Sequence, residues 1–172
     1  KRYSGKKIAV IGGGHSAINT LISLAEQKKT NPATELYWIM RKNKPEEAYG
    51  GEDNDQLEAR GELGSRIHHL VDQGIVNTIT PFYIQDITLA PAGVMLTGES
   101  SVGTGQLVID EIIANTGSRP DFSFINELRL SIDQTVESAE ALAPLIDPNV
   151  HSCGTVRPHG EKELRHGEHH FY

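Results

Sequence analysis

The feature that most constrains the fold of this chain is a short apolar run that leads directly into three glycines. The run Lys7–Ile11 is rich in β-branched residues, as a buried parallel strand requires. After the glycines, apolar residues recur on one helical face from Ala17 to Ala25. A second apolar run, Glu35–Met40, follows the break at Asn31-Pro32. The order strand, glycine turn, helix, strand predicts a βαβ unit.

The glycine turn itself has the pattern Gly12-x-Gly14-x-x-Ala17. In this pattern the first glycine permits a tight turn, the second lets a pyrophosphate approach the backbone, and the small third residue lets the helix pack closely on the strand. The start of the helix adds free N–H groups and the positive end of its dipole. The turn therefore predicts a dinucleotide site; the alternative is a turn that serves packing only. The candidate binding residues are Gly12, Gly13, Gly14, His15, Ser16 and Ala17.

The residues after the second strand indicate which dinucleotide is bound. An acidic residue at the carboxyl end of that strand would select NAD(H). Glu35 has suitable spacing from Gly14, but it begins the strand, whereas ligands lie beyond the carboxyl ends. Arg41 and Lys42 follow that end, and an arginine there can bind a 2′-phosphate. We therefore expect NADP(H), with NAD(H) and a merely solvated basic loop as alternatives.

The pattern of the chain changes after a helix expected at about Leu63–Gln73. Short extended segments separated by Pro and Gly predict an antiparallel meander, and they cover Ile75–Thr80, Phe82–Leu89, Val94–Thr97 and Gln106–Ala114. Asn115, Thr116 and Gly117 come directly after the last segment, so we expect them to line the cofactor site, a plain turn being the alternative. A weak helical pattern covers Thr135–Leu142. The predicted class is α/β, with a Rossmann-like parallel sheet, helices on both of its faces and an antiparallel β-meander crossover.

Composition excludes several classes of function. The 172 residues include 16 Lys and Arg against 23 Asp and Glu, a net charge of −7 that argues against a nucleic-acid binder. No apolar run is long enough to span a membrane, so we expect a cytoplasmic protein without membrane or nucleic-acid partners. The histidines of the tail lack a supporting ligand pattern, so no metal site is predicted.

Together these motifs resemble one family. The glycine turn, the basic Arg41, the meander and the segment Ala114–Asp121 occur in the same order in two-dinucleotide-binding-domain flavoproteins. These are FAD-dependent NAD(P)H oxidoreductases that include pyridine nucleotide–disulfide reductases and flavin-containing monooxygenases. The resemblance covers about residues 5–121, and Asn115 departs from it mildly by standing between Ala114 and Thr116.

The resemblance implies a division of labour. Residues 1–121 would form the NAD(P)-binding domain, and residues 122–172 a partial return segment of an FAD domain or a disordered boundary. FAD would be held by another part of the parent protein, since the family's FAD motifs do not occur in this sequence. This chain would then present the nicotinamide for hydride transfer to that flavin, without a catalytic residue of its own. Cys153 is the single cysteine, which excludes the C-x-x-C mechanism of the thioredoxin reductases here.

Two other classes compete with this interpretation. A stand-alone dinucleotide-sensing module would share the glycine turn, but it would continue the parallel alternation of strand and helix and keep an acidic residue after the second strand. A short-chain dehydrogenase needs a Tyr-x-x-x-Lys pair downstream of the turn. Tyr3 and Lys7 have that spacing but precede the turn.

Overall fold

The computed structural model describes residues 2–50, 58–147 and 156–171. The chain divides into two compact units, Lys1–Gly117 and Ser118–Tyr172. Cys153 lies outside the described residues. Within the described residues, no helix has both the length and the apolar character that crossing a bilayer demands.

The first unit is built on a parallel sheet of four strands in the order β3-β2-β1-β7. Its strands are β1 (Lys7–Ile11), β2 (Glu35–Ile39), β3 (Val76–Ile79) and β7 (Glu111–Ala114). β1 is central, with β2 and β7 paired in parallel on either side. The carboxyl ends of β2, β1 and β7 therefore lie next to one another at one edge of the sheet, beyond which ligands bind in folds of this kind.

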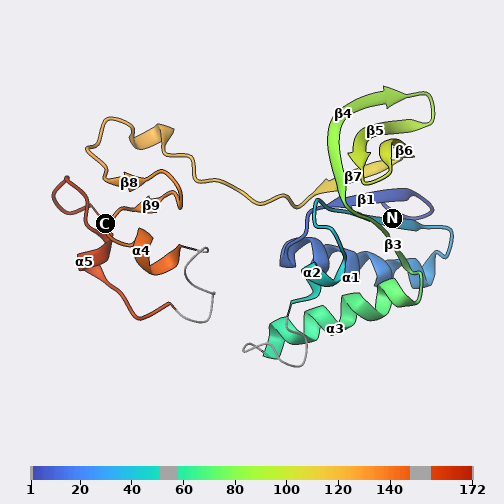
Figure 1. Ribbon diagram of the computed structural model, residues 1–172, viewed down its shortest axis with the longest axis horizontal. Helices are drawn as coiled ribbons and strands as arrows, with labels where there is room; N and C mark the ends of the chain where they lie inside the picture. Colours follow the sequence, from blue (N-terminus) through green and yellow to red (C-terminus); the bar gives the residue numbers. More distant parts are fainter. Residues whose placement is uncertain (1, 51–57, 148–155, 172) are drawn as a thin grey trace. The chain divides into compact units, whose positions relative to one another are not determined.

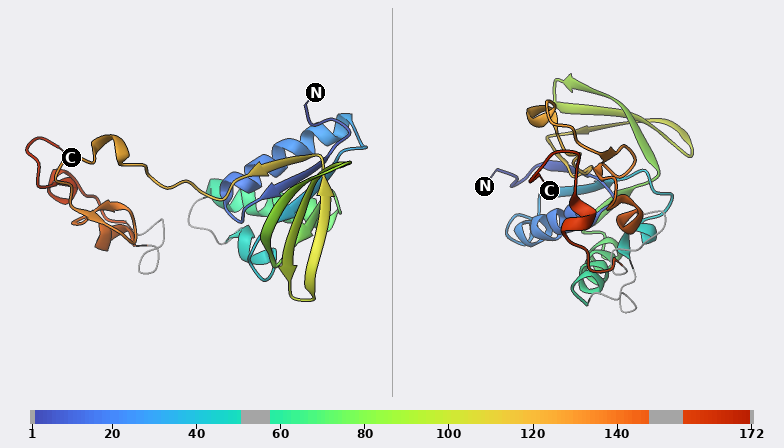
Figure 2. Two further views of the ribbon diagram at one scale, coloured as in Figure 1. Left: turned by 90° about the horizontal axis from the view of Figure 1, so that it is seen from above. Right: turned by 90° about the vertical axis from the view of Figure 1, so that its left-hand side faces the viewer.

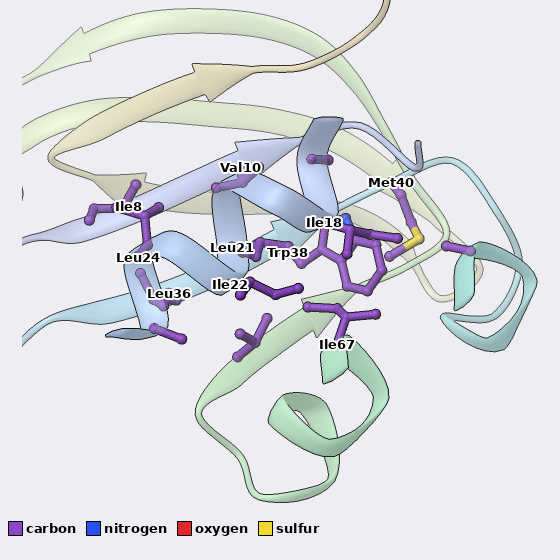
Figure 3. Close-up of a cluster of buried hydrophobic side chains, with 14 of the residues drawn as sticks. Ile8, Val10, Ile18, Leu21, Ile22, Leu24, Leu36, Trp38, Met40 and Ile67 are labelled. Atoms are coloured by element: carbon purple, nitrogen blue, oxygen red, sulfur yellow. The ribbon is translucent and has the colours of Figure 1, made fainter. Parts of the chain in front are cut away.

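One face of the parallel sheet is covered by helices. These are α1 (His15–Thr30), α3 (Glu58–Asp72) and the short α2 (Glu46–Tyr49). Alternate residues of β1, Ile8 and Val10, share a core with α1 and α3. In Figure 3 the Trp38 side chain lies among residues of α1 and Ile67 of α3, and both Trp38 and Ile67 are fully buried. Burial of such side chains is the main favourable contribution to folding.

The opposite face is covered by an antiparallel sheet. Its strands β4 (Phe82–Ala90), β5 (Gly93–Ser100) and β6 (Gly103–Ile109) form the order β4-β5-β6. Ala9 and Ile39 of the parallel sheet pack against Phe82, Leu96 and Ile109 of this second sheet. Figure 1 and the right-hand view of Figure 2 both show the three layers: antiparallel sheet, parallel sheet, helices.

This arrangement confirms the α/β class, the parallel sheet and the antiparallel crossover, and corrects three details. Helices cover one face rather than both, because the apolar inner side of the meander already buries the other face. Ile75–Thr80 contains β3, which joins the parallel sheet and not the meander. Gln106–Ala114 is two strands, β6 and β7, divided at Asp110, whose carboxylate accepts a hydrogen bond from the Lys7 N–H at 2.7 Å.

In the part of the second unit that the structure describes, all elements are short. They are η2 (Ser123–Ile125), β8 (Ile132–Asp133), β9 (Ser138–Ala139), α4 (Ala143–Ile146) and α5 (Glu161–Leu164). The helix expected over Thr135–Leu142 is wrong. The Asp133 carboxylate accepts hydrogen bonds from the backbone N–H groups of Thr135 and Val136, at 2.8 and 3.0 Å, which turns the chain into a hairpin.

Candidate functional site

The site is a pocket of about 780 Å³ at the carboxyl ends of β1, β2 and β7. The glycine turn forms its floor, the residues after β2 and β7 form two of its sides, and β4 contributes an apolar wall. It is lined by Ile11, Gly12, Gly13, Gly14, His15, Ser16, Ile39, Met40, Arg41, Phe82, Ile84, Ile87, Ala114, Asn115, Thr116 and Gly117.

The start of α1 opens into this pocket without a side-chain cap. Gly14 is the N-cap residue, no side chain caps the helix, and the first turn holds no acidic residue. The first intrahelical bonds run from Ala17 N and Ile18 N to Gly14 O, so the N–H groups of His15 and Ser16 precede them. Free N–H groups and the positive helix end favour an anionic ligand here.

The glycine turn is held by its neighbours on both sides. Gly12 N donates to Ile39 O at 3.0 Å, and the indole Nε1 of Trp38 donates to Gly12 O at 2.7 Å. On the other side, Asn115 N donates to Ile11 O at 2.7 Å. The approach is so close that a Cβ at Gly12 would lie 2.2 Å from Asn115 O. The turn is therefore rigidly placed before any ligand arrives.

Gly14 has a different environment. A Cβ built there meets nothing within 4 Å, so the absence of a side chain leaves space open above the helix start. At Gly13 a Cβ would meet only the side chain of Lys42, with Cε at 3.1 Å. The turn thus combines a packed glycine with an open one, and this fits a phosphate group resting on the backbone.

The two basic residues after β2, Arg41 and Lys42, have different surroundings in the structure. Arg41 is exposed and lines the pocket, and no ion-pair partner for it is found among the described residues. Lys42 does not line the pocket: its stem lies over Gly13, and its ammonium group donates to Glu47 O at 2.7 Å. Among the described lysines and arginines, Arg41 is therefore the one that lines the pocket.

Ala17 and Glu35 also lie away from the pocket. Ala17 is fully buried in the core beneath the turn, where its small side chain allows α1 to approach the sheet. Glu35 begins β2 at the opposite end of the sheet, where Tyr37 Oη donates to its carboxylate at 2.6 Å. That hydrogen bond raises the pKa of Tyr37. Glu35 cannot therefore serve the pocket.

Several lining residues have no signal in the sequence. Ile84 and Ile87 belong to β4, and Ile87 is 52% exposed although it is large and apolar. Only the folding of the antiparallel sheet over β2 brings this strand to the pocket: Phe82 N donates to Met40 O at 2.9 Å. The role of Trp38 has no signal in the sequence either, because a tryptophan in a strand does not reveal that its indole N–H will bind the glycine turn.

In the part of the chain that the structure describes, no group of three or more His, Cys, Asp or Glu residues is arranged to hold a metal ion.

Comparison with known proteins gives a consistent result. No family model matches the chain. A ferredoxin–NADP reductase of Enterococcus faecalis is 26% identical over 161 residues, which cover 91% of this chain and 41% of that protein. The chain thus spans about two fifths of the curated relative that it matches.

Solved structures with the same fold include a disulfide reductase and a monooxygenase. Bacillithiol disulfide reductase from Bacillus cereus matches with a TM-score of 0.58 at 20% identity, over 77% of this chain and 35% of that one. The FAD-bound cadaverine monooxygenase DfoA from Erwinia amylovora matches with a TM-score of 0.57 at 18% identity, over 81% and 43%. The predicted resemblance is confirmed: the chain is similar to a domain of pyridine nucleotide–disulfide oxidoreductases and FAD-dependent monooxygenases.

Proposed function

We propose that the first unit binds NADP(H) and presents its nicotinamide to a flavin held elsewhere in a longer parent protein. The observation that carries the proposal is the pocket in which three features converge: an uncapped helix start, an open glycine and Arg41, for which the described residues hold no ion-pair partner. A pyrophosphate fits the free N–H groups of α1, and a 2′-phosphate fits the guanidinium of Arg41. The relative named as a ferredoxin–NADP reductase supports the choice of nucleotide.

The residues of the site would act by binding the nucleotide and orienting its nicotinamide. The chemistry that a bound NADPH supplies is hydride donation, for which this site needs no protein base. His15, exposed in the first turn of α1, would lie beside the phosphates. Thr116 and Gly117, which follow β7, would flank the nicotinamide end, and β4 would shield one side of the nucleotide from water.

The FAD partner is part of the same proposal. The matched proteins are more than twice as long as the part that aligns with this chain, and one of them, the cadaverine monooxygenase, is bound to FAD, so the remainder of a parent protein can hold a flavin. We expect the purified chain to bind nucleotide while showing no flavin absorbance near 450 nm. A yellow protein that retains FAD through gel filtration would overturn this division of labour.

Parallel titrations with NADPH and NADH test the nucleotide preference. We expect NADPH to bind about tenfold or more tightly than NADH, because a charge-assisted pair with a phosphate contributes about 1.5–3 kcal/mol. Arg41→Ala should weaken NADPH about tenfold and leave NADH within about twofold. Arg66→Ala is the matched control, since Arg66 is an exposed arginine of α3 outside the pocket. Equal affinities for the two nucleotides in the unmodified chain would refute the role of Arg41.

A further inference from the structure

The side-chain amide of Asn115 is an unused polar group in the wall of the pocket. Asn115 is half-buried, and its Oδ1 is the one fully buried side-chain oxygen or nitrogen without a hydrogen-bond partner among the described residues. A buried acceptor without a partner is unfavourable by about the desolvation cost of that group. The backbone of Asn115 is meanwhile fixed, by its bond to Ile11 O and by its close contact with Gly12. A rigid backbone therefore carries an amide oxygen for which the described residues supply no partner.

The position of Asn115 assigns it to one end of the proposed ligand. Neighbouring strands lie about 4.8 Å apart, and the pocket crosses the ends of β2, β1 and β7 in that order. Arg41 follows β2, the glycine turn follows β1, and Asn115 follows β7. A dinucleotide with its 2′-phosphate at Arg41 and its pyrophosphate on the turn has its nicotinamide end at β7. This placement rests on the function proposed above.

The donor and acceptor of the Asn115 amide indicate which group of the proposed ligand it can bind. Phosphate oxygens only accept hydrogen bonds, so they cannot satisfy Oδ1. The carboxamide of the nicotinamide carries both an N–H₂ donor and a C=O acceptor. The asparagine amide carries the same two groups, so each amide can donate to the oxygen of the other. No hydrogen bond to Oδ1 is found among the described residues, so a rotation about the terminal torsion of the amide can turn Oδ1 toward the pocket that Asn115 lines. We propose that Asn115 pairs with this carboxamide and is the residue that recognises the nicotinamide end.

Three ligands titrated into the full chain test the proposal. They are NADP⁺, nicotinic acid adenine dinucleotide phosphate, in which a carboxylate replaces the carboxamide, and 2′,5′-ADP, which lacks the nicotinamide half. We expect the unmodified chain to prefer NADP⁺ to the nicotinic acid analogue. Asn115→Ala should weaken NADP⁺ roughly fivefold to tenfold, leave 2′,5′-ADP within about twofold and abolish the preference. Asn19→Ala, at an exposed asparagine of α1 outside this pocket, is the matched control.

A second readout separates recognition from a structural role. Without nucleotide, Asn115→Ala should unfold at the same temperature as the unmodified chain or higher, because it removes an unsatisfied buried oxygen. A residue that mattered only for folding would lower that temperature. Should the alanine variant fold poorly, Asn115→Asp keeps the side-chain shape. It should weaken the nicotinic acid analogue more than NADP⁺, since two carboxylates would then face each other.

The outcomes distinguish this inference from the proposed function. If NADP⁺ and 2′,5′-ADP bind but Asn115→Ala changes neither affinity, the inference is wrong and the nucleotide site stands. The same holds if 2′,5′-ADP binds as tightly as NADP⁺ to the unmodified chain. If neither ligand binds, the proposed function falls and the inference falls with it.

Discussion

At the scale of single residues, the glycines of the turn have separable roles. Gly12 has a φ of +138° and no room for a Cβ beside Asn115 O, whereas Gly14 has an extended φ of −109° and open space around it. We expect Gly12→Ala to lower the free energy of unfolding by about 2–3 kcal/mol, through strain and backbone displacement. Gly14→Ala should change that free energy by less than about 1 kcal/mol, yet weaken NADPH binding, because its methyl group would occupy the position proposed for the phosphate.

Denaturant unfolding and NADPH titration of both variants check this contrast. The two positions control for each other, since they lie two residues apart in the same turn. A Gly14→Ala protein that binds NADPH as the unmodified chain does would show that the turn serves packing only. A Gly12→Ala protein of unchanged stability would contradict the close approach to Asn115.

At the scale of elements, the edge strand β7 is tied to the segment before β1 by charge. The Lys6 ammonium contacts the Glu111 carboxylate at 2.6 Å, and Arg2 contacts it at 3.3 Å. The hydrogen bond from Lys6, reinforced by Arg2, lowers the pKa of Glu111 below its ordinary 4.5. A carboxyl group whose pKa is lower in the folded state stabilises the fold above its unfolded pKa, and this contribution is lost as the pH falls through the folded value.

Glu111→Gln tests this ion pair. We expect Glu111→Gln to lower the free energy of unfolding slightly at pH 7, because exposed ion pairs contribute little. As the pH falls below about 4.5, the difference in this free energy between the two proteins should shrink, because the carboxylate of the unmodified chain becomes protonated. The measurement is urea unfolding of both proteins between pH 7 and pH 3. Glu62→Gln, at an exposed glutamate of α3, is the control and should show no comparable trend. If the free energy of unfolding of the two proteins differed by the same amount from pH 7 to pH 3, this would contradict a stabilising ion pair.

At the scale of the whole molecule, every residue that lines the pocket belongs to the first unit. The second unit is built from short elements, and its buried apolar residues among those described are Ala139, Leu142 and Ala143. A core of this size contributes little free energy of folding. We therefore expect residues 1–117 alone to fold and to bind NADPH with the affinity of the full chain, as measured by circular dichroism and titration. A loss of binding on truncation would assign part of the site to residues 118–172.

The sequence predicted the elements whose signals are local. The βαβ unit and the glycine turn follow from hydrophobic period and from backbone requirements that neighbouring residues impose on one another. Local signals failed where a competing bond intervened, as at Thr135–Leu142, where the Asp133 carboxylate binds the backbone N–H groups that a helix would need. They also do not show where the Lys42 side chain lies, because a cation beside a strand end does not reveal which way its stem folds.

By itself, then, the sequence determined that a strand enters a helix through a glycine turn and that an arginine follows the next strand. Only the tertiary structure decided that the meander, and not a helix, covers the second face of the parallel sheet. The sequence pattern of a strand does not show against which surface its apolar face will pack. The tertiary structure also decided that Trp38 donates a hydrogen bond to the turn, that β4 lines the pocket and that Asn115 Oδ1 has no partner among the described residues. The physical reason is distance along the chain: packing brings together residues up to about a hundred positions apart, such as Gly12 and Asn115, and no local pattern encodes that contact.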